Sequence, residues 1–384
     1  MYLRRIPVII TAGLAACLGL SILVGTASAS TAVGHGSSGL STAKAAVAAA
    51  EQPIAAFTAP GPTFNAKPAT GKKVWFIGQS LDIPYTLSIE QAFATAMGDD
   101  HVSVQTCDGK NIPATIETCI TTAIDQHPAA IVQEGASPSV FATGAATAKK
   151  DGIPFVAGDP AVDPAHPYLG IPGEVNNPYV AASKLMADWA IAATNGKANV
   201  LVMDSPDISQ SVTMDSDIAA QVKALCSACH VWSTGAPGAE WATRLPGETS
   251  TELTQHPSIN YIIPVYDSMI PLITPAVKQA GADSRVSVVS FNADLPEMQM
   301  LATNTIVAAD LGNNLGYEGW ALADSALRLM THHTTNLHTT VPIRFFTRSS
   351  VKGLALTNAA VLSGQWYGAA NQFETGFLKL WGLS

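Results

Sequence analysis

The stretch KKVWFIGQSLDIPYTLSIEQAFATAM, residues 72–97, predicts the first repeat of an alternating strand and helix fold. Its apolar run at residues 74–77 is too short for a helix and rich in residues that favour β-structure, so we expect a buried strand. A polar loop follows at residues 78–83, and Pro84 suits a first helical position because its missing N–H needs no partner there. Apolar side chains then recur at helical spacing. The stretch therefore indicates strand, loop and helix in that order.

The loop after this strand carries the first candidate binding residues. In parallel sheets, ligands bind where loops leave the carboxyl ends of the strands. Taken alone, one such loop is an ordinary connection, and the rest of the chain supplies the context. The side chains that would contact a small molecule there are Gln79, Ser80, Asp82, Tyr85 and Thr86.

The chain beyond residue 100 continues the alternation. Short apolar runs predict strands at 102–106, 129–132, 154–157, 200–203, 261–264, 286–291 and 305–309. Helical patterns lie between most of them, at 114–125, 137–150, 179–193, 215–225, 269–280 and 314–330. Strands alternating with helices of this length are typical of parallel α/β sheets. Residues 158–178 hold five prolines and no clear periodicity, so we place the passage between two similar lobes there.

The first residues predict an export signal. Arg4 and Arg5 precede an apolar run at residues 6–24, and the sequence ASA at 27–29 matches a cleavage site, so we assign residues 1–29 to a signal peptide. Two alternatives stay open. The sequence LAAC would make Cys17 the lipid acceptor of a lipoprotein, and about 20 apolar residues can also span a bilayer as an uncleaved anchor. All three place the folded part outside the cytoplasm, in the periplasm or on the cell surface, with or without a membrane tether.

Residues 30–71 predict a tether rather than a domain, because Ala, Ser, Thr, Gly and Pro dominate them. Residues 42–52 have an Ala-rich helical pattern, and the prolines that follow favour an extended chain. About 310 residues remain, enough for two lobes. Hydrophobic residues make up 47% of the chain and charged residues 13%, which favours a packed core. The net charge of −9, with no basic patch, argues against a nucleic-acid partner.

The order of motifs from residue 72 to the C-terminus resembles the ribose/galactose-type periplasmic binding proteins, the solute receptors of ABC importers. The matching segments are KKVWFIGQSLDIPYTLSIEQAF, TCITTAIDQHPAAIVQEGASPSVFATGAATAKKDGIPFVAGD, YVAASKLMADWAI, INYIIPVYDSMIPLITPAVKQAG, VSVVSFNAD and FLKLWGLS. Each motif is unspecific alone, and their order and spacing carry the resemblance. It implies two Rossmann-like lobes with parallel sheets, joined by three crossing strands, with the ligand between them. The N-terminal lobe would hold residues 72–174 and 311–340, and the C-terminal lobe residues 179–309 and 343–384.

The resemblance extends to single positions. Asp159 matches the family's aspartate that accepts hydrogen bonds from sugar hydroxyls, Trp241 matches an aromatic residue that stacks on the sugar, and Tyr85 matches another aromatic residue. Gln79 joins them from the first loop. Elsewhere the residue type differs from the family: Thr86 replaces a second aromatic residue, Pro160 and Met214 replace arginines, Tyr266 replaces an asparagine, Asn292 replaces an aspartate, and Asp310 replaces a glutamine at a crossing.

This set implies a pocket that binds hydroxyl groups and stacks on a ring. A carboxylate accepts from two adjacent hydroxyls in charge-assisted bonds, which are stronger than neutral ones. Aromatic faces suit the C–H face of a pyranose or the plane of an aromatic solute. The missing arginines remove the bidentate partner of a carboxylate or phosphate, which disfavours anionic solutes and puts ribose itself in doubt. Trp241 and Tyr266 have an ordinary alternative as core residues, and Asp310 as a helix cap.

Four cysteines beyond Cys17 predict two disulfides in an exported chain: Cys107, Cys119, Cys226 and Cys229. Local pairs are the simplest connectivity, although the sequence leaves the pairing open. The segment CSACH at 226–230 also matches the attachment pattern of a c-type haem. A helix–strand turn in a regular lobe offers no evident place for a porphyrin, so we favour the disulfide and expect no cofactor.

No motif predicts catalysis or metal binding. The chain lacks a Gly-x-Ser-x-Gly elbow, a P-loop and an HExxH helix, so we expect a binding protein and not an enzyme. His332, His333 and His338 cluster in a Thr-rich stretch, without the cysteine or carboxylate set that would complete a metal site. A transcription regulator of this fold would need a helix-turn-helix head, and the chain begins instead with an export signal and a tether.

The residues and the resemblance together predict an exported solute receptor of an ABC importer. We expect a monomer that binds a sugar or polyol and delivers it to a membrane permease. Met214 and Pro160 favour an alternative, a receptor for a less polar or aromatic solute. A secreted sensory module that presents its ligand to a membrane receptor is the alternative from another class, since a fold alone does not establish a function.

Overall fold

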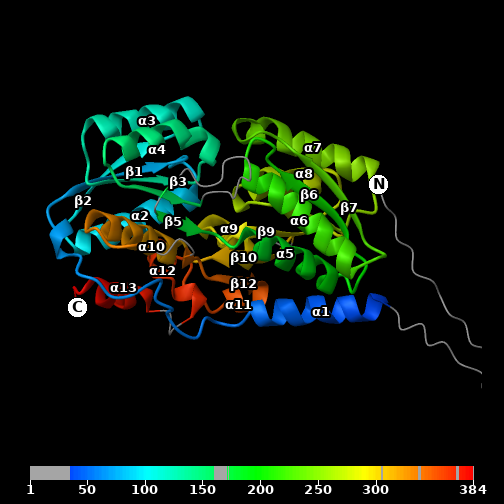
Figure 1. Ribbon diagram of the computed structural model, residues 1–384. Coiled ribbons are helices and arrows are strands. Elements are labelled where there is room, and N and C mark those ends of the chain that lie inside the picture. Colours follow the sequence, from blue (N-terminus) through cyan, green and yellow to red (C-terminus); the bar gives the residue numbers. More distant parts are fainter. Residues whose placement is uncertain are drawn as a thin grey trace, which may run out of the picture. The chain divides into compact units, whose positions relative to one another are not determined.

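The computed structural model describes residues 35–159, 171, 173–303, 306–335, 339–368 and 372–383. The predicted signal peptide, with its lipoprotein and anchor alternatives, lies outside the described residues, as do Pro160 and His338. From residue 35 onward the described chain contains two six-stranded sheets, each with helices on both faces (Figure 1). We call each sheet with its helices a lobe.

In the first lobe all neighbouring strands are parallel, in the order β11-β5-β4-β3-β1-β2. Side chains of β1 alternate between the two faces. Val74 and Phe76 are buried against α2, and Trp75 and Ile77 against α3 and α4. Burial on both faces explains why β1 is apolar without alternation. The elements are β1 Lys73–Gly78, β2 Ser103–Asp108, β3 Ala130–Glu134, β4 Phe155–Gly158, β5 Gly173–Asn176, β11 Thr339–Thr340, α2 Pro84–Asp99, α3 Pro113–Asp125, α4 Pro138–Lys150 and α10 Leu315–Met330.

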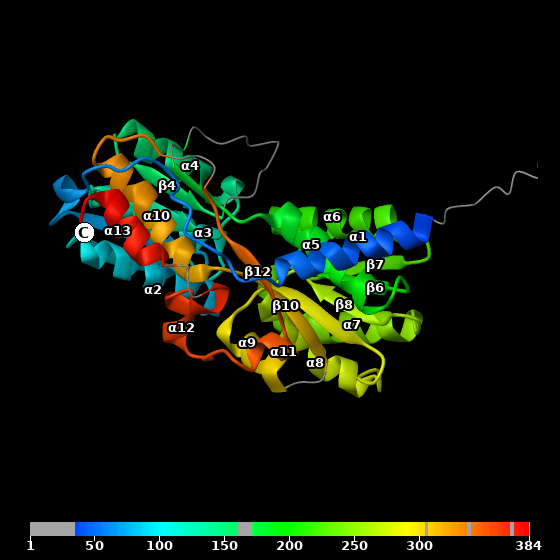
Figure 2. The same ribbon diagram turned by 90° about the horizontal axis from the view of Figure 1, so that it is seen from below.

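The second lobe has the strand order β12-β10-β9-β8-β6-β7, parallel except for β12, which pairs antiparallel with β10. Helices α5 and α6 cover one face and α7 and α8 the other (Figure 2). The predicted fold class, two α/β lobes with parallel sheets, is thus confirmed. The elements are β6 Asn199–Asp204, β7 His230–Gly235, β8 Tyr261–Pro264, β9 Ser287–Asn292, β10 Val307–Asn313, β12 Ile343–Thr347, α5 Tyr179–Ala193, α6 Ser209–Leu225, α7 Trp241–Gln255, α8 Ile270–Gln279 and α9 Leu295–Thr303.

The chain passes between the two sheets three times. The first passage leads from β5 to α5, the second from β10 to α10, and the third from β11 to β12. Strand β10 stays in the second sheet through Asn313, so the boundary predicted at residue 311 lies slightly too early. Each passage is only a few residues long, which brings its flanking side chains close to the junction of the lobes.

The interpretation of residues 30–71 as a tether is wrong for the part that the structure describes. Helix α1, His35–Ala50, lies along α5 and α6 of the second lobe, with Ala43 and Val47 buried in the contact (Figures 1 and 2). The extended chain after it crosses to the first lobe. There Phe64 N donates to Leu380 O at 2.8 Å, and Arg328 Nη2 donates to Pro62 O at 2.9 Å. An Ala- and Pro-rich composition conceals this packing, because small side chains allow close helix contact without a marked apolar pattern.

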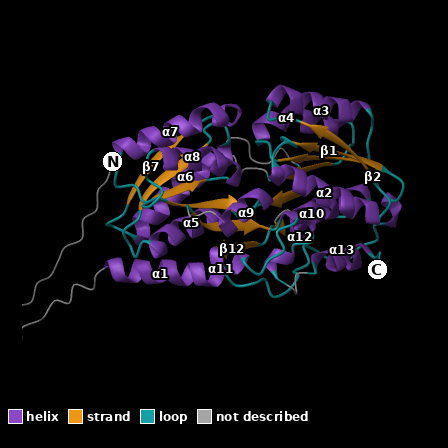
Figure 3. Cartoon of the chain, turned by 180° about the vertical axis from the view of Figure 1, so that it is seen from behind, coloured by secondary structure: helices purple, strands orange, loops and turns teal. Residues whose placement is uncertain are grey.

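Residues 343–384 were predicted in the second lobe, but the helix near their end lies against the first. Helix α13, Phe373–Trp381, packs beside α10 (Figures 1 and 3). Trp381 stacks on Trp320 of α10 with ring centroids 5.3 Å apart, and Trp381 Nε1 donates to Asp324 Oδ1 at 2.9 Å. The chain therefore returns to the first lobe after β12. The intervening short helices are α11 Arg348–Val351 and α12 Asn358–Leu362.

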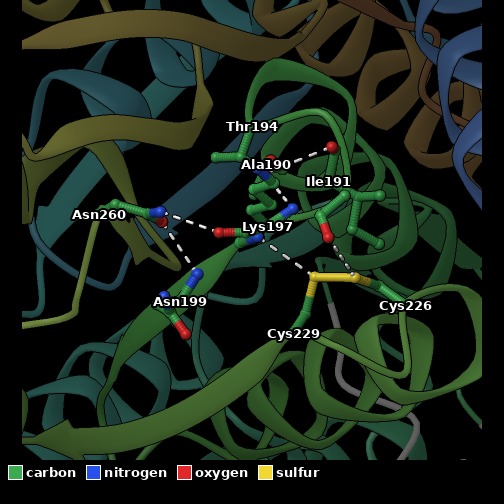
Figure 4. Close-up of a disulfide and its surroundings, with 10 residues drawn as sticks. Ala190, Ile191, Thr194, Lys197, Asn199, Cys226, Cys229 and Asn260 are labelled. Atoms are coloured by element: carbon green, nitrogen blue, oxygen red, sulfur yellow. Dashed lines mark hydrogen bonds between the residues drawn. A yellow bond between two sulfur atoms is a disulfide. The ribbon is translucent and has the colours of Figure 1, made fainter.

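The four cysteines form the two local disulfides, Cys107–Cys119 and Cys226–Cys229. The second closes the turn between α6 and β7 beside the start of β6 (Figure 4). Ala198 N donates to Cys229 Sγ at 3.2 Å. The start of β6 is also held by Asn260, which accepts from Asn199 N and donates to Lys197 O, both at 2.9 Å (Figure 4). With both sulfur atoms of the CSACH segment in this bond, no thiol is left for a haem.

Among the described helices, none combines the length and the apolar character that a membrane-spanning helix requires.

Candidate functional site

A cavity lies between the two lobes, where loops leave the carboxyl ends of the strands. Its volume is about 50 Å³. The first lobe contributes mostly polar side chains and the second lobe mostly aromatic and amide side chains. The lining residues are Gln79, Ile83, Tyr85, Thr86, Asn111, Gly135 and Asp159 from the first lobe, and Ile208, Gln210, Trp241, Tyr266, Ser268 and Asn292 from the second.

Asp159 is the carboxylate that lines this cavity. It follows β4 directly and has a φ of +57°, a left-handed conformation that is uncommon outside glycine. Backbone held in such a region is enriched at ligand-binding positions. Burial raises the pKa of Asp159, and hydrogen bonds from Tyr179, Asn177 and Tyr85 oppose that rise by stabilising the ionised form.

A buried hydrogen-bond network holds this carboxylate in place. Asn177 Nδ2 donates to Asp159 Oδ1 at 2.9 Å, and Tyr85 OH donates to Asp159 Oδ2 at 3.2 Å. Behind them, Glu318 accepts from Tyr85 OH at 3.3 Å and from Asn313 Nδ2 at 3.0 Å. Asn177 lies in the first passage between the lobes, and Asn313 and Glu318 flank the second. The network therefore connects the cavity wall to two of the passages between the lobes.

The second lobe presents an aromatic wall. Trp241 begins α7, and its ring centroid lies 6.3 Å from that of Tyr266, which follows β8. Trp241 Nε1 donates to Ser205 Oγ and to Ala236 O, both at 3.1 Å, so its polar edge is satisfied by the lobe. Both side chains are half-buried and keep part of their surface open to the cavity. An aromatic surface of this kind suits stacking on a ring or on a C–H face.

Gln210 joins the two lobes across the cavity. It stands in the first turn of α6, and its Nε2 donates to Asp159 O of the first lobe at 2.9 Å. Its Oε1 is buried and has no hydrogen-bond partner. A buried amide oxygen without a partner is costly, so it is available to a donor on a ligand.

Among the described residues of the lining, Asp159 is charged and no Lys, Arg or His accompanies it. A carboxylate or phosphate ligand would be buried there beside a like charge and without a basic partner. The described lining therefore suits a neutral or cationic solute.

The structure brings most of the predicted binding residues to this cavity. Gln79, Tyr85, Thr86, Asp159, Trp241, Tyr266 and Asn292 all line it.

Met214 and Asp310 were predicted to bind ligand and do not line the cavity. Helix α6 begins at Ser209, several residues before the helix predicted at 215, so Met214 lies inside it and is fully buried in the core. Asp310 is fully buried in β10, and its Oδ1 accepts from Ala293 N at 3.1 Å. It faces a group of carboxylates inside the second lobe.

Sequence reasoning missed eight residues of the site. Asn177 and Glu318 orient side chains of the lining, and six others line the cavity: Ile83, Asn111, Gly135, Ile208, Gln210 and Ser268. Asn111 carried a usable signal, because it lies in the loop that follows the predicted second strand. Nothing in the sequence indicated Asn177 and Glu318, because the course of the chain between the lobes is what brings them to the site.

Comparisons with known proteins agree with this geometry. The family model "Periplasmic binding protein domain" matches residues 74–334. The comparison with curated proteins finds no match. Among solved structures, an ABC transporter solute-binding protein from Agrobacterium vitis with bound allitol is 17% identical. It covers 74% of this chain and 98% of its own, with a TM-score of 0.66.

Two further structures share the fold. A periplasmic solute-binding protein of an ABC transporter from Actinobacillus succinogenes, with bound D-allose, is 17% identical and covers 74% of this chain and 100% of its own, with a TM-score of 0.66. A sugar ABC transporter protein from Yersinia enterocolitica is 15% identical and covers 85% and 99%, with a TM-score of 0.70. The family match spans well over half of the chain, and the solved structures share its fold. The chain therefore belongs to the periplasmic binding protein domain family, a family of extracytoplasmic solute-binding proteins and not of enzymes.

Proposed function

We propose that this protein is the receptor of an ABC importer for a neutral polyhydroxylated solute, a sugar or polyol, which it delivers to a membrane permease. The observation that carries the proposal is Asp159, a carboxylate held by Asn177 and Tyr85 at the cavity wall and facing an aromatic wall on the other lobe. A carboxylate accepts hydrogen bonds from adjacent hydroxyls, and aromatic faces stack on the C–H surface of a sugar. Allitol and D-allose bound to the two structures named above support the same solute class.

Binding by closure of the two lobes is part of this proposal. The cavity of about 50 Å³ is far below the roughly 300–1,000 Å³ typical of ligand pockets, so the lobes must separate to admit a solute. The passages between the sheets are short, which suits a hinge. Direct contacts across the cleft include Gln210 Nε2 to Asp159 O at 2.9 Å and Ser137 Oγ to Ser209 Oγ at 3.3 Å. These two hydrogen bonds favour a closed form, and a ligand that contacts both lobes would stabilise that form further.

A less polar or aromatic solute is the second candidate, because Ile83 and Ile208 line the cavity beside Trp241 and Tyr266.

The proposal also includes export of the mature protein as a monomer. A sensory role at the membrane would use the same pocket and the same closure, and differs only in the partner that the closed form contacts.

A thermal-shift screen followed by calorimetry tests the solute class. The panel should contain pentoses, hexoses, polyols, aromatic acids and sugar phosphates, since a ligand that binds only the folded protein raises the Tm. We expect a neutral sugar or polyol to raise it and sugar phosphates to have no effect. A response confined to aromatic acids would replace the proposal with the second candidate.

Small-angle scattering tests the closure. We expect a smaller radius of gyration with saturating solute than without, because the ligand contacts both lobes only in the closed form. An unchanged radius at a saturation proven by calorimetry would contradict closure and indicate a rigid binding protein.

A further inference from the structure

Four buried carboxylates meet inside the second lobe, behind the wall of the cavity. Asp267 begins the turn η3 (Asp267–Met269) after β8, Asp294 precedes α9, Glu297 lies in the first turn of α9, and Asp310 is part of β10. Their exposed fractions are 0%, 1%, 3% and 0%. Ligand atoms of the first three lie within 4.8 Å of one another. We call these four residues the acidic cluster.

The acidic cluster has too few hydrogen-bond donors. Ser290 Oγ and Asp294 N donate to the two oxygens of Asp267, the latter at 2.8 Å, and Ala293 N donates to Asp310 Oδ1. Three side-chain oxygens remain buried without a partner: Asp294 Oδ1, Glu297 Oε2 and Asp310 Oδ2. No described Lys, Arg or His forms an ion pair with any of the four.

Asp310 is an observation separate from the three grouped carboxylates. It comes from the neighbouring strand β10, it is fully buried, and the oxygen that Ala293 does not occupy has no partner. Its carboxyl group lies close enough to Asp267 to interact with it directly, and the charges of Asp294 and Glu297 also act on it. Asp310 thus adds a fourth buried carboxylate beside the three grouped ones.

Several buried like charges require a counter-charge. An isolated carboxylate is strongly disfavoured in a buried environment, and buried charges in proteins are paired or coordinate a metal. Burial raises the pKa of Asp294 and of Asp310, and the charge of Asp267 adds to the rise in both. Protons on these groups are therefore the competing means of neutralisation.

We propose that the acidic cluster binds a divalent hard cation, Ca²⁺ in preference to Mg²⁺. Ca²⁺ takes oxygen ligands at about 2.3–2.6 Å and accepts irregular sets of six to eight, so ligands on opposite sides of it lie roughly 5 Å apart. Asp267, Asp294 and Glu297 each offer one oxygen within 4.8 Å of the others, close enough to share one such ion. Mg²⁺ needs shorter, near-octahedral bonds and retains several waters, so an irregular set of carboxylates suits it less well. Asp310 adds a further carboxylate beside Asp267.

The site would fix the loop that carries Asn292 to the cavity. Asn292 and Ala293, the two residues before Asp294, have φ angles of +142° and +55°. Ala293 N is held by Asp310, and Asp294 N by Asp267. An ion bound to these carboxylates would therefore stabilise a strained turn at the edge of the ligand cavity, without contacting the solute.

The test uses the purified full chain after treatment with a chelator, in the absence of any solute. Thermal unfolding and calorimetry are measured with CaCl₂ and with MgCl₂, and the metal content of the untreated protein is determined by mass spectrometry. We expect Ca²⁺ to raise the Tm by about 3 °C or more at a millimolar concentration, because an ion that binds only the folded state stabilises it. We expect its Kd to be at least tenfold lower than that of Mg²⁺.

Two conservative variants locate the ion. Asp294→Asn and Glu297→Gln should each weaken Ca²⁺ binding at least tenfold, since each removes one charged ligand while keeping the side-chain shape. Asp188→Asn is the matched control, because Asp188 is a buried carboxylate of the same lobe that accepts from Gln221 Nε2 outside the acidic cluster. That variant should keep the wild-type response.

The proposal is overturned if Ca²⁺ and Mg²⁺ neither bind in calorimetry nor change the Tm of the chelator-treated wild type. It is also overturned if Glu297→Gln keeps the full Ca²⁺ response. If Asp294→Asn fails to fold, Glu297→Gln and the wild-type titration still decide. None of these measurements uses the solute, so they stand apart from the test of the proposed function.

Discussion

Each lobe buries a group of carboxylates near the junction, and the two groups differ in how their oxygens are satisfied. In the first lobe, Asp159 and Glu318 accept hydrogen bonds from Tyr85, Asn177 and Asn313. In the acidic cluster of the second lobe, three side-chain oxygens have no partner. Glu134 is the third carboxylate of the first group, since the charges of Glu318 and Asp159 act on it. Its two carboxylate oxygens are buried without a hydrogen-bond partner. The first group presents Asp159 to the cavity, whereas no member of the acidic cluster lines it.

The difference shows that residue type alone does not mark a binding residue. An aspartate whose oxygens are held by neutral side-chain donors keeps a defined orientation and can accept further hydrogen bonds from a solute. Aspartates that face one another need a proton or a cation instead. We therefore propose solute recognition for Asp159 and cation binding for the acidic cluster.

The largest effect should come from Asp159→Ala. We expect the affinity for the solute to fall by about 100-fold or more in calorimetry, because buried hydroxyls of the ligand would lose charge-assisted partners worth roughly 1.5–3 kcal/mol each. The comparison variant is Asp310→Asn in the acidic cluster, which should lower the affinity by less than about threefold. Equal losses in the two variants would contradict the different roles assigned to the two groups. Normal binding with a lower Tm would reduce Asp159 to a structural role.

Trp241→Ala tests whether the second lobe contributes by stacking. Loss of a large aromatic contact in a binding site should cost about 1–3 kcal/mol, or roughly 5- to 150-fold in Kd, while the fold remains. Tryptophan fluorescence of the wild type should change when the solute is added. Trp189→Phe is a control. Trp189 lies on α5, its Nε1 donates to Tyr261 OH at 2.7 Å, and it does not line the cavity. An unchanged affinity in Trp241→Ala would make Trp241 part of the surface or core alone.

Gln210→Ala tests the direct hydrogen bond between the two lobes. It removes the bond from Gln210 Nε2 to Asp159 O, so we expect Kd to rise about three- to tenfold, in line with roughly 1 kcal/mol for a neutral hydrogen bond. Without solute, the radius of gyration should shift toward the open form. Gln221→Ala on the same helix is the control, because Gln221 bonds to Asp188 within the second lobe. Identical behaviour of the two variants would leave Gln210 without a role between the lobes.

The smallest effect concerns Glu174, a buried carboxyl of β5 outside both groups. Burial raises its pKa from 4.5 to about 7. Because the folded state binds the proton more tightly, the stabilisation that Glu174 contributes is complete below about pH 4.5 and is lost as the pH rises through about 7. Glu174→Gln should therefore gain stability relative to the wild type between about pH 5 and 8, measured as the urea midpoint. Parallel pH curves for the two proteins would contradict the shift.

The strands and helices of the two sheets were predictable where their patterns are local. The runs at 74–77 and 261–264 lie within β1 and β8, because buried parallel strands are continuously apolar. Helix α7 escaped prediction, since it buries only Leu245, Thr249 and Leu253 and contains Pro246. Strand β11 has two residues, too few for any pattern. The candidate site was largely predictable because most of its residues follow strands, where the resemblance also placed them.

By itself, the sequence determined the alternation of strands and helices and the position of Asp159 at a strand end, and it left the pairing of the four cysteines open. These features depend on periodicity and on neighbours close in the chain. The tertiary structure alone decided that α1 and α13 pack onto the lobes, that Met214 belongs to the core, and that Asp310 faces other carboxylates. Such facts depend on contacts between distant segments, as when Asn177, Asn313 and Glu318 meet behind Asp159. Local sequence carries no record of these contacts, because the partners become neighbours only when both sheets and the passages between them have formed.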